Sequence, residues 1–160
     1  MKRISNIGSL LRKIYRLYSL ELLSVLQRRG FTDLRPSFLE ILTFICEHDG
    51  PSIKTIGKAC GLKKQTMTSH LNELEKRGYI RRQINPADKR EQNIFLTEYG
   101  EKFKFHLFET VGELEKEYSS RFGEVELNRV ELLLENLHRE LNKERWESSR
   151  STTMPFSQLV

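Results

Sequence analysis

The segment Asp88-Lys89-Arg90 carries two adjacent cationic side chains that are suited to bind an anionic polymer. An arginine at the tip of a turn can enter the minor groove of a duplex, where negative potential is concentrated. Asp88 has the wrong charge for a phosphate, so we expect its carboxylate to accept hydrogen bonds from the Arg90 guanidinium and to orient it. A solvated surface ion pair, contributing about 0–1 kcal/mol to folding, is the alternative. The expected phosphate contacts nearby are Lys89, Arg81 and Arg82.

A second group of polar side chains recurs on one side of residues 64–77. Met67, Leu71 and Leu74 are spaced as on the buried side of a helix, which leaves small polar residues on the opposite side. Gln and Asn can pair with adenine, Ser and Thr can contact bases or a thymine methyl group, and Lys suits phosphate. We expect His70, at the edge of the inward side, to pack as a neutral side chain. The expected DNA contacts are Lys63, Lys64, Gln65, Thr66, Thr68, Ser69, Asn72 and Lys76.

The elements expected around these residues are two short helices and a hairpin. Residues 53–59 and 64–77 show helical spacing, and the runs Tyr79-Ile80 and Ile94-Phe95-Leu96 predict two strands. Asn85-Pro86 begins the polar turn between the strands. A helix-turn-helix followed by a charged hairpin is a winged helix, which indicates binding to duplex DNA. Ser52 can cap the first of these helices, Gly61 allows a sharp turn between them, and Gly78 ends the second.

Longer amphipathic helices are expected on both sides of this motif. Apolar residues recur at three- and four-residue steps from residue 4 to 26, and Pro36 suits the first position of a second helix. Thr97 can cap a long helix, and a last helix is expected over about 124–142. The predicted fold is mainly α with a small β-hairpin wing. The predicted domains are dimerisation helices 1–34 and 98–144, a winged helix-turn-helix 35–97, and an extended or mobile C-terminal tail 145–160.

These flanking helices carry more apolar surface than a small central domain can cover. Either they form a bundle with each other, or they bury that surface against a second subunit. Two-fold dimers are the commonest solution, and they suit palindromic DNA sites. We therefore expect a homodimer with double-stranded DNA as its partner.

The charge of the chain is uneven, although its net value is +5. Residues 53–92 hold 10 basic and 4 acidic side chains, whereas residues 93–160 hold 9 basic and 13 acidic ones. A basic excess over the predicted helix-turn-helix and hairpin is the electrostatic footprint of phosphate binding. No apolar run approaches the ~18 residues of a membrane span, and basic residues interrupt the N-terminus where a signal peptide would be apolar. We therefore expect a cytoplasmic protein without membrane contacts.

The sequence contains no phosphate loop, nucleophile motif or convergent acid–base set. We therefore expect no enzyme activity, no catalytic residue, no cofactor and no metal site. Cys46 and Cys60 are far apart, which indicates buried free thiols rather than a disulfide or a zinc site.

These motifs resemble the multiple-antibiotic-resistance regulator (MarR) family of winged helix-turn-helix transcription factors, over about residues 10–142. The most specific element is the Asp-x-Arg pattern of the hairpin with a downstream Leu-Thr-x-x-Gly. The resemblance implies a homodimer whose first helix and last two helices intertwine, with a recognition helix and a wing from each subunit on one palindromic site. The segments that carry it are Ile56–Leu62, Leu74–Ile80, Asp88–Arg90 and Leu96–Gly100.

The same resemblance implies regulation by a small ligand or an oxidant that changes the spacing of the DNA-binding lobes. The oxidant-sensing branch of the family carries a cysteine in its first helix, and the zinc-sensing branch carries paired histidines on its fifth helix. This chain has no cysteine in the first helix and a lone His106 in the fifth, so both sensing modes are disfavoured. Lys63 replaces a common capping Ser, so the cap comes from elsewhere or the helix N-terminus is left for a DNA phosphate.

The expected function is a repressor that a small-molecule effector releases from DNA. A flat aromatic effector would suit a pocket bordered by aromatic side chains, and core packing is the competing explanation for those residues. The alternative is an effector-independent DNA-binding protein controlled by a protein partner, which the tail could serve, or by its own concentration. The aromatic set is Tyr15, Tyr18, Phe38, His48 and Phe103, and the tail set is Trp146, Met154, Pro155 and Phe156.

Overall fold

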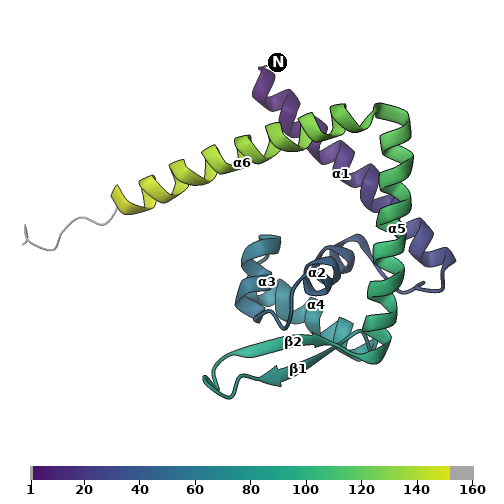
Figure 1. The fold of residues 1–160 in the computed structure, drawn as a ribbon. Helices are drawn as coiled ribbons and strands as arrows, with labels where there is room; N and C mark the ends of the chain where they lie inside the picture. Colours follow the sequence, from purple (N-terminus) through teal and green to yellow (C-terminus); the bar gives the residue numbers. More distant parts are fainter. Residues whose placement is uncertain (1, 152–160) are drawn as a thin grey trace, which may run out of the picture. The chain divides into compact units, whose positions relative to one another are not determined.

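The computed structural model describes the backbone of residues 2–151 and the side chains of residues 2–143. The chain divides into two compact units, Met1–Leu114 and Glu115–Val160. The described residues form six helices and one two-stranded antiparallel sheet, which confirms the predicted fold, mainly α with a small β-hairpin wing (Figure 1). The elements are α1 (Arg3–Arg28), α2 (Pro36–Glu47), α3 (Ile53–Cys60), α4 (Lys64–Lys76), β1 (Ile80–Ile84), β2 (Gln92–Leu96), α5 (Glu98–Phe122) and α6 (Glu124–Ser151).

In the first unit, α3 and α4 form the predicted helix-turn-helix. The Ser52 hydroxyl accepts a hydrogen bond from the Thr55 N–H at 3.1 Å, which caps the start of α3. Gly61 lies between the two helices with φ of 64°, a left-handed conformation that glycine adopts without a steric penalty. Gly78 follows α4 with φ of 83°. The predicted cap at Ser52, the predicted turn at Gly61 and the predicted stop at Gly78 are therefore confirmed.

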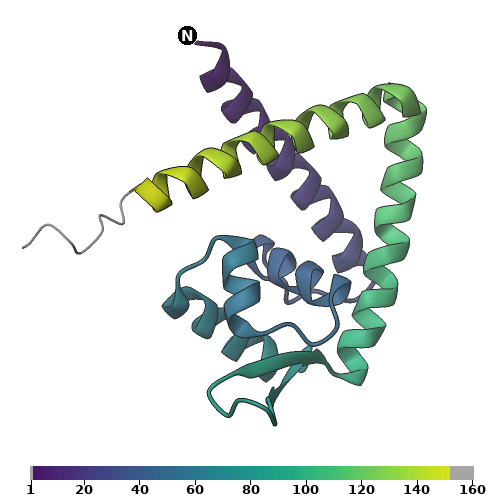
Figure 2. The same cartoon turned by 60° about the vertical axis from the view of Figure 1, so that its left-hand side comes forward.

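The hairpin β1–β2 is anchored to the start of the helix-turn-helix. Its strands pair antiparallel, with Ile80 opposite Leu96 and Ile84 opposite Gln92. The Ile94 N–H donates to the Pro51 carbonyl at 2.9 Å, which ties β2 to the residues just before α3. The turn of the hairpin projects away from the helices of this unit (Figure 2). This anchoring holds the hairpin beside α3 and α4 and leaves its turn exposed.

The start of α5 is pressed against the hairpin. The Thr97 hydroxyl accepts a hydrogen bond from the Gly100 N–H at 3.0 Å, so the predicted cap of α5 is confirmed. A Cβ atom at Gly100 would lie 2.1 Å from the Tyr79 carbonyl oxygen, so this close approach requires glycine. The core beneath these elements includes Leu26, Phe38, Ile41, Leu42, Ile56, Met67, Leu71, Leu74, Ile80, Ile94, Phe103 and Leu107.

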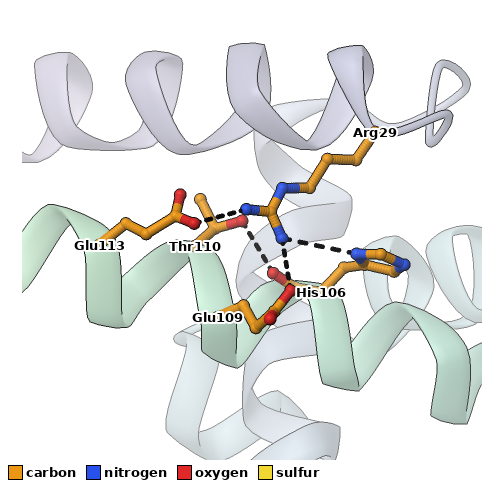
Figure 3. A network of polar contacts seen from close by, with 5 residues as sticks. All are labelled: Arg29, His106, Glu109, Thr110 and Glu113. Carbon is orange, nitrogen blue, oxygen red and sulfur yellow. Dashed lines mark hydrogen bonds and ion pairs between the residues drawn. The ribbon is translucent and has the colours of Figure 1, made fainter.

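Arg29, immediately after α1, joins that helix to α5 within the first unit (Figure 3). Its guanidinium forms ion pairs of 2.8 Å with Glu109 and with Glu113. The same group lies 3.5 Å from Nδ1 of His106, and the buried Thr110 hydroxyl donates to the His106 carbonyl at 2.7 Å. The end of α1 is therefore held against α5 by a polar network as well as by apolar packing.

The second unit contains the end of α5 and the whole of α6. The last helix continues to Ser151, so the prediction of an end near residue 142 and of an extended tail from residue 145 is wrong for residues 145–151. Lys, Glu and Arg are good helix formers, and they sustain the helix where the apolar period is weak. Met154, Pro155, Phe156 and the side chain of Trp146 lie outside the described part of the chain.

Candidate nucleic-acid interface

The two sides of α4 differ as the sequence predicts. Met67, Leu71 and Leu74 are at most 1% exposed and pack into the core. The Thr68 hydroxyl donates to the Lys64 carbonyl at 2.9 Å, so its oxygen lone pairs and its methyl group remain for an external contact. The exposed residues of this helix and its N-cap include Lys63, Lys64, Gln65, Thr66, Thr68, Ser69, Asn72 and Lys76.

The N-terminus of α4 has no side-chain cap. Lys63 occupies the N-cap position in an extended conformation, and its side chain makes no hydrogen bond to the helix backbone. The first N–H groups of a helix have no partner within it, and together with the helix dipole they favour an anion. The N-cap side chain therefore does not cap this end of α4, and its use for a DNA phosphate stays a prediction.

His70 does not share the exposed side of α4. Its ring meets the buried Phe38 ring edge-on, with 5.2 Å between the ring centroids, and the side chain is half-buried. The prediction that His70 packs against the inward side is therefore confirmed.

The turn of the hairpin is closed by side chains that accept hydrogen bonds from its backbone. The Asp88 carboxylate accepts from the Arg90 N–H at 3.0 Å, and the Asn85 side-chain oxygen accepts from the Ala87 N–H at 2.9 Å. The expectation that Asp88 binds the Arg90 guanidinium is therefore corrected, because the carboxylate orders the main chain of the turn instead. Asp88, Lys89 and Arg90 are all exposed at this tip.

Arg81 and Arg82 lie on opposite faces of β1, since successive side chains of a strand alternate. The Arg81 guanidinium lies over the Phe95 ring, 4.8 Å from its centroid. Arg82 faces α4, where its Nε lies 2.8 Å from the Glu75 carboxylate and its Nη2 donates to the Asn72 side-chain oxygen. The two arginines expected to bind phosphate together therefore do not share a surface.

A groove of about 760 Å³ runs between α3, α4 and the hairpin. Its basic side chains outnumber its acidic ones, Asp88 and Glu91, and its floor includes the apolar Ile53, Leu62 and Met67. Sequence reasoning missed two of these cations, Lys54 and Lys58, although their spacing of four residues places them on one side of α3. The basic residues of this groove, which we call the basic groove, are Lys54, Lys58, Lys64, Arg82 and Arg90.

The aromatic residues proposed for an effector pocket are not gathered in one place. Phe38 and Phe103 are 1% and 0% exposed in the core, as the competing explanation of core packing predicts. The His48 ring stacks on Phe44 and lines a separate cavity of about 360 Å³. Tyr15 is half exposed on α1. Phe38 and Phe103 are therefore core residues, and the role of the other three in an effector site stays a prediction.

Both cysteines are free thiols, as predicted, but only Cys46 is buried and Cys60 is partly exposed. Burial raises the pKa of the Cys46 thiol to about 12, and burial followed by the nearby Glu40 charge raises the pKa of Cys60. Both shifts disfavour the reactive thiolate. Among the described residues, no three His, Cys, Asp or Glu side chains gather as metal ligands, and no helix has the length and apolarity to cross a membrane.

Comparison with known proteins places this interface among related structures. Residues 32–91, which span α2 to the hairpin turn, match the model of the MarR family. The HTH-type transcriptional regulator TtmR of Methylorubrum extorquens (strain PA1) is 38% identical over 69 residues, which are 43% of this chain and 35% of that protein. The matched part thus spans about a third of the length of that relative.

Solved structures match over most of this chain. A MarR transcriptional regulator from Methanosarcina mazei Go1 has a TM-score of 0.74 at 21% identity, covering 87% of this chain and 98% of that chain. MepR of S. aureus, solved as a complex with DNA, has a TM-score of 0.69 at 24% identity, covering 84% and 96%. PcaV of Streptomyces coelicolor, solved with its natural ligand, has a TM-score of 0.67 at 17% identity, covering 87% and 96%. At these identities the likeness shows the fold.

Proposed function

We propose that the chain is a sequence-specific DNA-binding transcriptional regulator of the MarR family, because residues 32–91 match the model of that family and 69 residues are 38% identical to a transcriptional regulator. In this proposal α4 enters the major groove and the hairpin turn reaches the adjacent minor groove. The observation that carries it is the basic groove, because the exposed side of α4 and the tip of the hairpin border one cationic surface.

The residues of the interface have different roles in this proposal. Lys63, Lys64 and the free N-terminus of α4 bind phosphate, and Lys89 adds a phosphate contact at the wing. Gln65 and its polar neighbours on the same side reach base edges. Arg90, held at the tip by the turn that Asp88 closes, enters the minor groove. Lys54 and Lys58 extend the phosphate contacts along α3.

We propose further that the chain acts as a homodimer on a palindromic operator. In the first unit, α1 exposes Ile14 and Leu17, which are 60% and 69% exposed. In the second unit, α6 exposes its own apolar residues, among them Leu133 at 61%. Exposed apolar faces of this kind mark interaction surfaces, and a second copy of the chain would bury them. In this proposal residues 1–34 and 98–144 are the dimerisation helices, and residues 35–97 are the DNA-binding domain.

Control by a small effector is the finer part of the proposal: the chain represses transcription until the effector releases it from DNA. The support is by analogy, since PcaV, which has the same fold, was solved with a natural ligand. The alternative is an effector-independent regulator, controlled by a protein partner or by its own concentration. The burial of Phe38 and Phe103 favours this alternative, because both side chains were expected to border an aromatic ligand and lie in the core instead.

The test is selection of bound sequences from a random duplex pool at about 150 mM salt, since phosphate-driven affinity depends steeply on salt. We expect an inverted repeat with half-sites about one helical turn apart. Tight, salt-sensitive binding without an enriched motif would instead indicate a protein that coats DNA without sequence preference. Absence of binding would contradict the proposal for the chain alone.

A further inference from the structure

Arg82 bridges two side chains of the proposed recognition helix. Its Nε lies 2.8 Å from the Glu75 carboxylate, and its Nη2 donates to the side-chain oxygen of Asn72. Asn72 and Glu75 are three residues apart on α4, so one guanidinium on β1 spans a turn of the helix. Arg82 is 23% exposed, whereas Asn72 belongs to the exposed side that would enter the major groove.

This contact determines which end of the Asn72 amide is free. A guanidinium carries only hydrogen-bond donors, so the amide atom that it contacts is the carbonyl oxygen. The amide nitrogen, with its two hydrogens, is the end left to face outward. Without Arg82 the amide could turn over and present either its oxygen or its nitrogen to a base.

We propose that Arg82 is a positioning residue for base recognition, which holds Asn72 as a hydrogen-bond donor toward the DNA. The inference rests on the proposed DNA-binding function. A donor in the major groove needs an acceptor, which purines offer at N7, guanine also at O6 and thymine at O4, whereas cytosine offers only the N4 amino group. Asn72 therefore excludes cytosine from the base that it contacts.

The ion pair between Arg82 and Glu75 favours this positioning role of Arg82 over a direct contact with phosphate. Glu75 balances the charge of Arg82, so the pair adds little net attraction for the phosphate backbone. The effect of Arg82 should consequently fall on base preference rather than on overall affinity. If Arg82 only stabilised the fold, its substitution would not change the base preference at a single position and leave the other positions unchanged.

The test compares sequences selected from a random duplex pool by the full chain and its variants. The wild-type protein should deplete cytosine at least about fivefold at one position of each half-site, and Asn72→Ala identifies that position by losing the depletion. Arg82→Lys keeps the charge but cannot span Asn72 and Glu75, so cytosine should return at that position alone. Arg121→Lys, the same change at an exposed arginine of α5 that pairs with Glu117 and does not line the basic groove, should leave the profile unchanged.

A second variant tests the donor role of the Asn72 amide directly, without a substitution at Arg82. Asn72→Asp replaces both donor hydrogens by acceptor lone pairs, so the same position should shift to the bases that carry an amino donor, cytosine at N4 and adenine at N6. An Arg82→Lys profile identical to wild type, a uniform loss at all positions, or an Asp variant that still depletes cytosine would overturn the inference and leave the proposed function intact. A wild-type profile without any enriched motif would overturn the proposed function and the inference together.

Discussion

The Asp88 carboxylate accepts a hydrogen bond from the backbone N–H of Arg90 at 3.0 Å. A second bond, from the Glu91 N–H to the Asp88 carbonyl at 3.0 Å, closes the same turn. Asp88 therefore shapes the wing through its backbone, and the Arg90 guanidinium remains available for DNA. This arrangement explains why an acidic residue is tolerated beside a proposed phosphate-binding surface.

We expect the Asp88→Asn and Asp88→Ala variants to differ in DNA affinity, although both substitutions remove the negative charge. Asn keeps a side-chain oxygen that can accept from the Arg90 N–H, whereas Ala leaves the turn less ordered. The Ala variant should bind the selected duplex about 0.5–1.5 kcal/mol more weakly than the Asn variant, the usual contribution of one hydrogen bond. Fluorescence anisotropy titrations measure the difference. Equal affinities would show that the hydrogen bond does not prepare the wing.

Arg90→Ala should weaken specific DNA binding by ~1–3 kcal/mol and leave the oligomeric state unchanged. The side chain is exposed at the tip and lines the basic groove, so its removal leaves the core intact. Arg90→Lys is the matched control, since it keeps the charge and loses only the planar guanidinium. The quantity to measure is the dissociation constant for the selected duplex at one stated salt concentration. An affinity equal to wild type would rule out the wing contact.

Local sequence patterns were sufficient to predict the elements of this fold. The spacing of Met67, Leu71 and Leu74 determines which side of α4 is buried, and Gly61 and Gly78 end their helices through local conformation alone. Such features depend on neighbours within a few residues. They are therefore visible without knowledge of tertiary structure.

Contacts between elements were not predictable in the same way. Arg82 meets Asn72 and Glu75 only because β1 packs beside α4, and no local pattern specifies which charges meet. Lys54 and Lys58 likewise line the basic groove because the hairpin lies across from α3. The opposite orientation of neighbouring residues on β1, by contrast, follows from strand alternation and was available from the sequence.

Lys54→Ala and Lys58→Ala should each weaken DNA binding, and each loss of affinity should be about the same for every DNA sequence. A lysine that contacts phosphate contributes charge rather than base recognition, so each loss should lower the slope of log affinity against log salt by about 1. Both residues line the basic groove and are exposed. The matched control is Lys102→Ala, an exposed lysine on α5 that does not line this groove. Titrations at three salt concentrations give the slopes, and unchanged slopes would remove α3 from the interface.

Cys46 should make the stability of the protein depend on pH in alkaline solution. Burial raises the pKa of its thiol from 9.0 to about 12, so the folded state resists formation of the thiolate. This contribution to the free energy of unfolding is fully present below pH 9 and is lost as the pH rises toward 12. Urea unfolding between these values should show the decrease, and Cys46→Ala should make it smaller, while Cys60 and the tyrosines with raised pKa values keep the remainder. Rapid alkylation of Cys46 in the folded protein at pH 8 would contradict the prediction.

Leu17→Glu should convert a dimer into a monomer. Leu17 is 69% exposed on α1 in the single chain, so the substitution costs the isolated fold little, whereas a buried charge in a dimer interface is expensive. Light scattering after size-exclusion chromatography gives the mass, and circular dichroism shows whether the helices persist. Arg12→Glu places the same acidic side chain at an exposed polar position of α1 and serves as the control. A Leu17→Glu variant that keeps the mass of a dimer would exclude this face of α1 from the interface. A folded monomer with weaker binding to the inverted repeat would connect dimerisation to operator recognition.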